Sequence, residues 1–321
     1  MTITALITGV TGQDGPYLAR FLLEKNYRVV GTVRSYRHAK LENLVYLGIQ
    51  EQVVVEELDL QDMANVIRVL KKYQPDELYN LAAQSSVGLS FEQPIGTFSF
   101  NTASVNNLLE AIRLFYPSIR FYQASSSEMF GETDKMPISI DSPMRPVSPY
   151  AVSKLASYFM TRNYRNAYGL KVCNGILFNH ESYLRSENFF MKKIIRQAIL
   201  LKEGKISKVT VGNLDIKRDF GYAPKYVEAM WRMLQLEETE DFLICSGKSI
   251  GLRDIVYYVF DRLGLDRHKI FEDESLFRPN EIHEIFGDNS RSVARLDWKY
   301  PYKSFLEVLD ILIDEELRNW K

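Results

Sequence analysis

Short apolar runs alternate with longer amphipathic stretches along roughly the first 180 residues of the chain. The apolar runs are typical of buried strands and lie at residues 3–8, 27–33, 53–58, 77–81, 120–124 and 171–178. The stretches between them predict helices, among them residues 17–26, 63–73, 103–115 and 148–169. Strands that alternate with helices predict right-handed βαβ units. We therefore expect an α/β fold with a doubly wound parallel sheet that is covered on both faces.

The pattern is less regular after about residue 180. Helices are predicted at 189–204, 226–236 and 305–320, with short strands at 208–212 and 241–247. This portion is expected to form a smaller C-terminal α/β lobe, so the predicted domains are residues 1–178 and 179–321, interleaved near that boundary. We expect a ligand in the cleft between the lobes, at the carboxyl ends of the strands.

Composition and charge narrow the possible partners. Of 321 residues, 46% are hydrophobic and 25% are charged, as in an ordinary globular protein. The formal net charge of −1 gives no bulk attraction for nucleic acid or an anionic membrane, so neither is expected as a partner. No apolar stretch approaches the ~18 residues that span a bilayer. We expect a cytoplasmic protein without a metal site, in which Cys173 and Cys245 are buried free thiols.

A glycine motif, Gly9-x-x-Gly12-x-x-Gly15, follows the first predicted strand. Small residues there let the backbone approach a pyrophosphate at the positively polarised N-terminus of the next helix. Between a strand and a helix, this spacing indicates a Rossmann-type dinucleotide site; a glycine-rich turn without a ligand is the alternative. The residues expected to contact the dinucleotide are Gly9, Thr11, Gly12, Gln13, Asp14 and Gly15.

Segments after the later strands indicate which dinucleotide is bound. An acidic residue after the second strand would bind the 2′-hydroxyl of NAD, but Arg34 and Ser35 stand there and suit the 2′-phosphate of NADP. NADP is therefore predicted over NAD, unless Arg34 is an ordinary surface residue. Asp59, beside Leu60, is placed to accept a hydrogen bond from the adenine amine. Mostly small residues after the fourth strand would let the cofactor lie close: Leu81, Ala82, Ala83, Gln84 and Ser85.

A Tyr-x-x-x-Lys pair marks the candidate reaction centre. Tyr150 and Lys154 are four residues apart on a predicted helix and so share one face. The ammonium is expected to lower the pKa of the phenol from its reference value of ~10, so that Tyr150 can take a proton from a substrate hydroxyl. Ser126 and Glu128 follow the fifth strand. Glu128 adds a base that can remove a carbon-bound proton and return it as an acid, which makes the protein a candidate dehydratase.

Longer motifs around these residues resemble those of one family. They are LAAQSSVG (81–88), YQASSSEMFG (122–131), SPYAVSK (148–154), NGILFNHES (174–182), KRDFGYAPKYVEAMW (217–231) and FRPNEI (277–282), together with the glycine motif. They resemble the GDP-mannose 4,6-dehydratases of the extended short-chain dehydrogenase/reductase superfamily. The glycine and Tyr-Lys motifs belong to the superfamily, whereas LFNHES and KRDxGYA are specific to this subgroup.

The resemblance implies roles for the reacting residues. Ser126 would stand in place of the family's catalytic threonine, and Glu128 would be the base and acid. Tyr150 would be the active-site tyrosine, with Lys154 as its partner. Both are also expected to contact the cofactor, Lys154 at the nicotinamide ribose. The implied reaction converts GDP-mannose to GDP-4-keto-6-deoxymannose. Hydride passes from C4 of the sugar to NADP and back to C6 while water leaves, so the cofactor is not consumed and tight retention of it is expected.

Binding positions follow from the same resemblance. His180 and Arg185 match cofactor-binding positions. The sugar-nucleotide site would be lined by Ser85, Ser126, Glu128, Asn179, Lys193, Arg218, Arg278 and Glu281, with the cations facing the diphosphate. The resemblance also implies a homodimer or homotetramer, with the helices around residues 102–115 and 150–168 at the contact.

Two segments depart from the family's pattern. Where members have Ser-Pro-x-Arg-Gly, this chain has Ser182-Tyr183-Leu184-Arg185-Ser186. The larger Tyr183 is expected near the sugar, which leaves a related nucleotide sugar such as a GDP-heptose as an alternative substrate. The family's Arg-Arg-Ser-Ser stretch is Arg34-Ser35-Tyr36-Arg37 here, which bears on both the cofactor preference and the oligomer.

Two other functions compete with dehydration. A GDP-4-keto-6-deoxyhexose reductase or a sugar-nucleotide epimerase would share the fold and use Tyr150 and Lys154, but a reductase has no use for a base at Glu128. A non-catalytic NADP-binding regulator belongs to a different class. The intact set of serine, glutamate, tyrosine and lysine argues against it, so dehydration is the predicted function.

Overall fold

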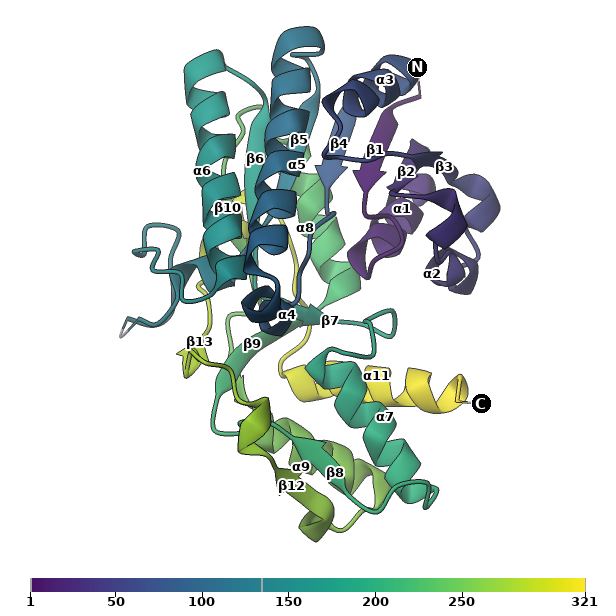
Figure 1. Ribbon diagram of the computed structural model, residues 1–321, viewed down its shortest axis with the longest axis vertical. Coiled ribbons are helices and arrows are strands. Elements are labelled where there is room, and N and C mark those ends of the chain that lie inside the picture. Colours follow the sequence, from purple (N-terminus) through teal and green to yellow (C-terminus); the bar gives the residue numbers. More distant parts are fainter. Residues whose placement is uncertain (1, 134, 321) are drawn as a thin grey trace.

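A seven-stranded parallel sheet forms the core of the computed structural model, which describes residues 2–133 and 135–320 (Figure 1). In spatial order its strands are β10 (Phe242–Ile244), β6 (Val172–Leu177), β5 (Arg120–Ser126), β4 (Glu77–Asn80), β1 (Thr4–Thr8), β2 (Arg28–Val33) and β3 (Val54–Glu57). The chain runs outward from β1 to β3 and then returns to β4 on the other side of β1. Ligands of such sheets bind beyond the carboxyl ends of the strands, where the order reverses.

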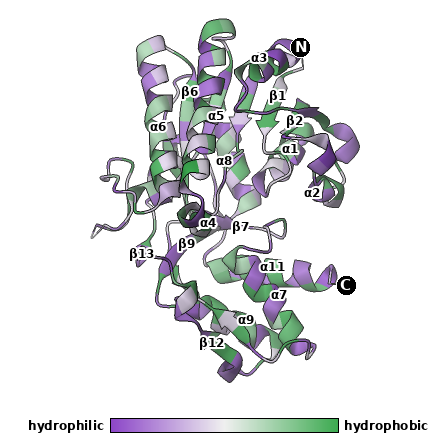
Figure 2. Ribbon diagram, in the orientation of Figure 1, coloured by the Kyte–Doolittle hydropathy of each residue, from purple (hydrophilic) through white to green (hydrophobic). Residues whose placement is uncertain are grey.

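Helices cover both faces of this sheet. On one face lie α3 (Met63–Tyr73), α5 (Pro94–Phe115) and α6 (Pro149–Tyr168), and on the other α1 (Asp14–Glu24) and α8 (Ala223–Gln235) (Figure 1). Alternate residues of β1 divide between the faces, since Leu6 packs with the first group while Ala5 and Ile7 pack with the second. Figure 2 shows that the helices carry both hydrophobic and hydrophilic residues, as amphipathic helices do. The predicted doubly wound α/β fold is confirmed.

A smaller lobe surrounds a second apolar core. One of its sheets contains β7 (Asn179–Glu181), β9 (Lys217–Tyr222), β11 (Ser249–Gly251) and β13 (Glu284–Ile285), and the other pairs β8 (Val209–Val211) with β12 (Ile270–Glu272). The helices α7 (Phe190–Lys202), α9 (Leu252–Leu263) and α11 (Phe305–Arg318) pack around Ile194, Val256 and Leu309. Of these helices, α9 was not predicted from the sequence.

Short elements complete the described part of the chain. They are α2 (Glu42–Tyr46), α4 (Val87–Glu92), α10 (Ser290–Leu296) and the 3₁₀ turns Tyr36–His38, Gln50–Gln52, Ser127–Phe130, Arg267–Lys269 and Glu274–Leu276. The large sheet crosses the expected boundary at residue 178, because β10 pairs with β6 and α8 packs against β5 and β6. Within residues 2–133 and 135–320, no helix is long and apolar enough to cross a membrane.

The helix that carries the Tyr-x-x-x-Lys pair has well-defined ends. Ser148 caps α6, since its Oγ accepts a hydrogen bond from a backbone N–H of the first turn at 3.1 Å, and Pro149 occupies a position that needs no N–H partner. Gly169 ends the helix in the left-handed conformation, with φ of 66°. With its start fixed at the edge of the sheet, α6 presents Tyr150 and Lys154 to the ligand cleft.

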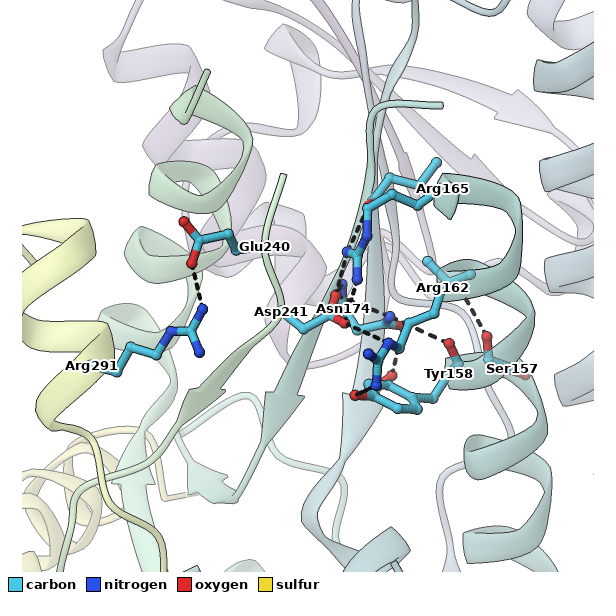
Figure 3. A network of polar contacts seen from close by, with 11 residues as sticks. Ser157, Tyr158, Arg162, Arg165, Asn174, Glu240, Asp241 and Arg291 are labelled. Atoms are coloured by element: carbon cyan, nitrogen blue, oxygen red, sulfur yellow. Dashed lines mark hydrogen bonds and ion pairs between the residues drawn. The ribbon is translucent and has the colours of Figure 1, made fainter. Parts of the chain in front are cut away.

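Asp241, which directly precedes β10, ties α6 to the sheet (Figure 3). Its carboxylate accepts two hydrogen bonds from the guanidinium of Arg165, at 2.7 and 2.8 Å, and one from the backbone N–H of Asn174 at 2.8 Å. Arg162 approaches the same carboxylate to 3.8 Å. This buried ion pair joins α6, β6 and the start of β10, which come from separate parts of the sequence.

Asp241→Asn is expected to lower the free energy of unfolding by about 3 kcal/mol, because Arg165 would keep a largely buried charge without its partner. Urea unfolding followed by circular dichroism measures this change. The matched control is Glu240→Gln, whose partners Arg291 and Arg295 are 49% and 57% exposed; there we expect a change below about 1 kcal/mol. Equal effects of the two substitutions would contradict a special contribution of the buried pair.

Candidate active site

A deep cleft lies between the large sheet and the smaller lobe, with the ends of β1, β4 and β5 on one side. Its volume of about 1270 Å³ exceeds the ~300–1,000 Å³ typical of a pocket for one small ligand. The glycine motif and the ends of the strands line one side, and residues of β7, β9 and α7 line the other. The cleft therefore has room for a dinucleotide together with a second ligand.

The glycine loop between β1 and α1 is closely packed, and it brings the start of α1 to the cleft. Gly9 has φ of 70°, and a Cβ on Gly15 would lie only 2.6 Å from the carbonyl oxygen of Gly9. Asn43 of α2 holds the loop from outside by donating to the carbonyls of Thr11 and Gly12, at 3.2 and 2.9 Å. Gln13 and Asp14 line the cleft with the rest of the loop. The N-terminus of α1 thus fits a diphosphate group.

The segment after β2 lies where adenosine was expected. The side chain of Arg34 is 73% exposed, and its Nε is 3.9 Å from the carboxylate of Asp59, so the guanidinium remains accessible to a ligand. Leu60 lines the same part of the cleft. Glu57, which was not predicted, also lines it and accepts a hydrogen bond from the backbone N–H of Tyr36 at 3.0 Å. An exposed glutamate that ends a strand gives no distinctive signal in the sequence.

The segment after β4 divides between the cleft and α5. The residues that line the cleft are Leu81, Ala82, Ala83 and Ser85. Gln84 does not line it, because its backbone N–H donates to Asn101 Oδ1 and its Nε2 to Thr97 Oγ1, both at 2.9 Å. Gln84 therefore anchors the loop to α5 instead of facing the expected cofactor.

The four residues expected to react lie together where β5 ends and α6 begins. Ser126 is the last residue of β5, and its Oγ accepts a hydrogen bond from the backbone N–H of Glu128 at 3.3 Å. Lys154 Nζ donates to the carbonyl of Ala124 at 2.8 Å and lies 5.9 Å from the centre of the Tyr150 ring. All four side chains line the cleft, yet each residue is less than a tenth exposed. A hydroxyl, a carboxylate, a phenol and an amine thus share a largely buried region of the cleft.

Burial dominates the proton affinities in this region. It raises the pKa of Tyr150 to about 12; the Ser126 hydroxyl acts against this shift and the charge of Glu128 adds to it. Burial also lowers the pKa of Lys154 to about 8. Lys154 was expected to lower the pKa of the phenol, but that pKa lies above its ordinary value, because burial dominates it.

Cations gather on the other side of the cleft. Arg218 of β9 is 3% exposed, and its Nη2 donates to Glu281 at 2.9 Å. Arg278 Nη1 reaches the same carboxylate oxygen at 3.3 Å. Burial lowers the pKa of Arg218, and the carboxylates of Glu128 and Glu281 oppose that shift. Since Lys193 and Asn179 line the cleft as well, this region suits an anionic ligand with hydrogen-bonding groups.

His180 and Arg185 lie beside the glycine loop, and protein groups occupy both ring nitrogens of His180. His180 Nε2 is 2.9 Å from Asp14 Oδ2. Arg185 Nε is 3.5 Å from Glu181 Oε2, and its guanidinium lies 3.7 Å from the centre of the Phe189 ring. Both residues still line the cleft. Glu181 was not predicted, because a buried glutamate in a three-residue strand has no periodicity to mark it.

Tyr183 lies outside the residues that line the cleft. Its ring packs against Tyr46 of α2 at a centroid distance of 4.6 Å, and Lys192 Nζ lies 3.8 Å from its centre. Lys192 also donates to the carbonyl of Tyr183 at 2.8 Å. The expectation that Tyr183 sits near the sugar is therefore wrong, because its neighbours α2 and α7 hold it away from the cleft.

Several residues of the smaller lobe line the cleft without having been predicted. They are Phe189, Phe190, Gly212, Asn213, Leu252 and Leu276. Apolar and small side chains carry no chemical motif of their own. Of these residues, only Gly212 and Asn213 could have been predicted from the sequence, because they lie shortly before the motif that contains Arg218.

The chain is similar to known proteins over almost its whole length. The family model described as GDP-mannose 4,6 dehydratase matches residues 6–311. GDP-mannose 4,6 dehydratase 1 of Arabidopsis thaliana is 42% identical over 324 residues, which cover 98% of this chain and 89% of that protein.

Two solved structures share the fold. The dTDP-glucose 4,6-dehydratase of Bacillus anthracis in complex with NAD has a TM-score of 0.87 at 18% identity and covers 99% of this chain and 97% of its own. RMD from Pseudomonas aeruginosa complexed with NADPH has a TM-score of 0.80 at 24% identity and covers 99% of each chain. Because the family model and the Arabidopsis relative match nearly the whole chain, the protein belongs to the GDP-mannose 4,6-dehydratase family.

Proposed function

We propose that the protein converts GDP-mannose to GDP-4-keto-6-deoxymannose, with NADP as the hydride carrier. The observation that carries this proposal is the position of Glu128, which shares the buried part of the cleft with Tyr150 and whose charge acts on both Tyr150 and Arg218. A reductase needs the tyrosine and the lysine but no such carboxylate. Elimination of water needs the carboxylate as well. The Arabidopsis relative is named for the same reaction.

The cofactor would lie along the glycine loop. Gly15 lets the start of α1 pack closely on the backbone of Gly9, so that the loop and the N-terminus of α1 line the cleft, and Arg34 offers an accessible cation to a 2′-phosphate. The solved structures of similar fold hold NAD in one case and NADPH in the other, so the preference for NADP rests on Arg34. When bound, the nicotinamide would accept hydride from C4 of the sugar and return it to C6.

The side chains would move the protons of this cycle. Tyr150 takes the proton of the 4-hydroxyl while Ser126 donates a hydrogen bond to the same oxygen. The resulting 4-ketone acidifies the C5 proton, which Glu128 removes and then gives to the departing 6-hydroxyl. The proton held by Tyr150 returns to C5 as C6 receives hydride. One water leaves, and neither the cofactor nor the side chains are consumed.

The cations of the smaller lobe would hold the diphosphate of the sugar nucleotide. Lys193, Arg218 and Arg278 supply the charge, and Glu281 keeps both arginines in place. The size of Tyr183 suggested a GDP-heptose as an alternative substrate. Since Tyr183 packs outside the cleft, the unexpected residue does not argue against a hexose, and mannose is the favoured sugar.

Incubation with GDP-mannose and no added reductant tests this function. We expect a product lighter by one water, with NADP supporting faster turnover than NAD after bound cofactor has been removed. If GDP-mannose stays unchanged while another nucleotide sugar loses water, the substrate is wrong. If neither loses water but a 4-keto sugar oxidises added NADPH, the protein is a reductase.

We also propose a homodimer that forms through α5 and α6. Large apolar side chains of these helices face solvent, with Ile95 84%, Phe98 44%, Val152 42% and Phe159 52% exposed, and a second copy would remove them from water. Light scattering is expected to give twice the mass of the chain, and a monomer would contradict the proposal.

Buried free thiols at Cys173 and Cys245 fit a reducing compartment such as the cytoplasm.

A further inference from the structure

Three contacts join the glycine loop and the start of α1 to β7, the first strand of the smaller lobe, and to the residue that follows it. Gln13 Nε2 donates to the carbonyl of His180 at 3.0 Å, and Gln13 Oε1 accepts from Ser182 Oγ at 3.2 Å. Asp14 Oδ2 lies 2.9 Å from His180 Nε2. The loop expected to hold the diphosphate of the cofactor is thereby fastened to the strand that brings Asn179 to the cleft.

Both partners of the His180 ring are hydrogen-bond acceptors. Its Nδ1 lies 2.8 Å from the carbonyl oxygen of Phe178, while Nε2 faces the carboxylate of Asp14. Neither oxygen can donate, so both ring nitrogens must carry a hydrogen for both contacts to be hydrogen bonds. The ring is 8% exposed and stacks on Tyr226, with centroids 4.6 Å apart. The geometry therefore suits an imidazolium ion and leaves neither nitrogen free for a ligand.

The groups that face this ring come from several elements. They are Asp14 of α1, Glu181 of β7, Arg185 of the following loop and the phenol of Tyr226 on α8. Burial raises the pKa of the phenol and keeps it neutral. With His180 charged, two carboxylates balance two cations. Without the His180 proton, the cluster would have a net negative charge beside the expected position of an anionic diphosphate.

The proton on His180 is held by its partner. Burial acts against the charged ring, but the charge of Asp14 and the hydrogen bond to it outweigh burial, so the pKa of His180 lies above its ordinary value. The pKa of Asp14 is lowered in turn, because the attraction of His180 outweighs burial there as well. A raised histidine pKa means that the ion pair is present at low pH and is lost as pH rises through that pKa.

We propose that Asp14 and His180 form a proton-dependent clasp that keeps the dinucleotide in the cleft between turnovers. Asp14 is the positioning residue: its carboxylate holds the charged ring, and the ring holds β7 against the glycine loop. The clasp suits a reaction that returns hydride to the sugar from which it came, because the cofactor need not leave. This inference rests on the proposed function only in that the ligand of the loop is a nicotinamide dinucleotide.

The release rate of NADP from the full-length protein tests the clasp. Wild-type protein loaded with NADP is expected to release it about ten- to a hundredfold faster at pH 9 than at pH 6, the worth of one charge-assisted hydrogen bond. Asp14→Asn is expected to release NADP faster than the wild type at pH 6, whereas the contribution of Lys154, whose pKa is about 8, is the same in both proteins. The control Asp241→Asn, which breaks a buried ion pair elsewhere, should unfold more readily but keep the wild-type pH dependence.

Whether Asp14→Asn speeds or slows the release of NADP separates the clasp from simple repulsion between Asp14 and the diphosphate. Removing a negative charge near a bound diphosphate would by itself slow release, whereas loss of the clasp speeds it. Nitrogen NMR of the histidine rings gives a second measure in folded protein, since the chain has only four histidines. We expect His180 to show an imidazolium signal at pH 7 in the wild type and a neutral signal in Asp14→Asn.

The outcomes distinguish this inference from the function on which it rests. If wild-type protein binds neither NADP nor NAD at any pH, the proposed function fails and the clasp fails with it. If it binds NADP and Asp14→Asn releases it at the wild-type rate throughout, the clasp alone is overturned. A neutral His180 ring at pH 6 in the wild type would overturn it as well.

Discussion

Replacing Glu128 by glutamine is expected to slow formation of the dehydrated product about a thousandfold, within the range for a general acid–base group. The amide keeps the size of a side chain that is buried in the cleft, but it cannot take the C5 proton or pass it to the departing oxygen. Hydride transfer from C4 precedes this step, so bound NADP should still become reduced. Product mass and the absorbance of reduced nicotinamide, followed in one reaction, measure both effects.

Glu132→Gln is the matched control for this substitution. Glu132 lies four residues further along, with a side chain that is 49% exposed and a carboxylate 3.4 Å from His283. The same chemical change there should leave dehydration near the wild-type rate. If Glu128→Gln still forms the dehydrated product at the wild-type rate, Glu128 is not the base, and the main argument for a dehydratase is lost.

Tyr150→Phe is expected to block the reaction one step earlier. Without the phenol, nothing takes the proton of the 4-hydroxyl, so reduction of NADP and loss of water should both slow about a thousandfold. The pKa of Tyr150, which burial raises to about 12, means that the phenol is protonated at neutral pH and that its basic form increases as pH rises. The wild-type rate of NADP reduction should therefore rise with pH above neutrality.

This pH dependence should disappear in Tyr150→Phe, and rapid mixing at several pH values measures it. Tyr158→Phe is the control, since Tyr158 lies on the same helix, is 1% exposed and has its hydroxyl 3.1 Å from Arg162 Nη1. It should keep the wild-type rate and its rise with pH. If Tyr150→Phe accumulated reduced NADP as Glu128→Gln is expected to, another group would have to take the first proton.

Consecutive residues contained enough information to place the reacting groups at one edge of one sheet. Apolar runs identify the strands β1 to β6, and segments that follow parallel strands meet at their carboxyl ends. Ser126 and Glu128 follow β5 directly, and Tyr150 and Lys154 share a helix face because of their four-residue spacing. These positions follow from the periodicity of strands and helices and from short spacings in the sequence. They do not depend on contacts between distant segments.

Side-chain partners were harder to predict, because they come from distant segments. Gln84 follows a strand in the same way as its neighbours, but it turns to α5, where Asn101 and Thr97 meet it. Tyr183 stands in a motif of the active site and yet packs between α2 and α7. The phenol of Tyr150 has a lysine four residues away, but its pKa follows the burial that the whole cleft imposes.

The sequence by itself determined the fold class, the family resemblance and the candidate reacting residues, because periodicity and motifs are properties of neighbouring residues. Only the tertiary structure decided that β10, from beyond residue 178, completes the sheet and that Asp241 secures it. It also decided which charges meet. Asp14 and His180 are 166 residues apart and become partners only because β7 packs against the glycine loop.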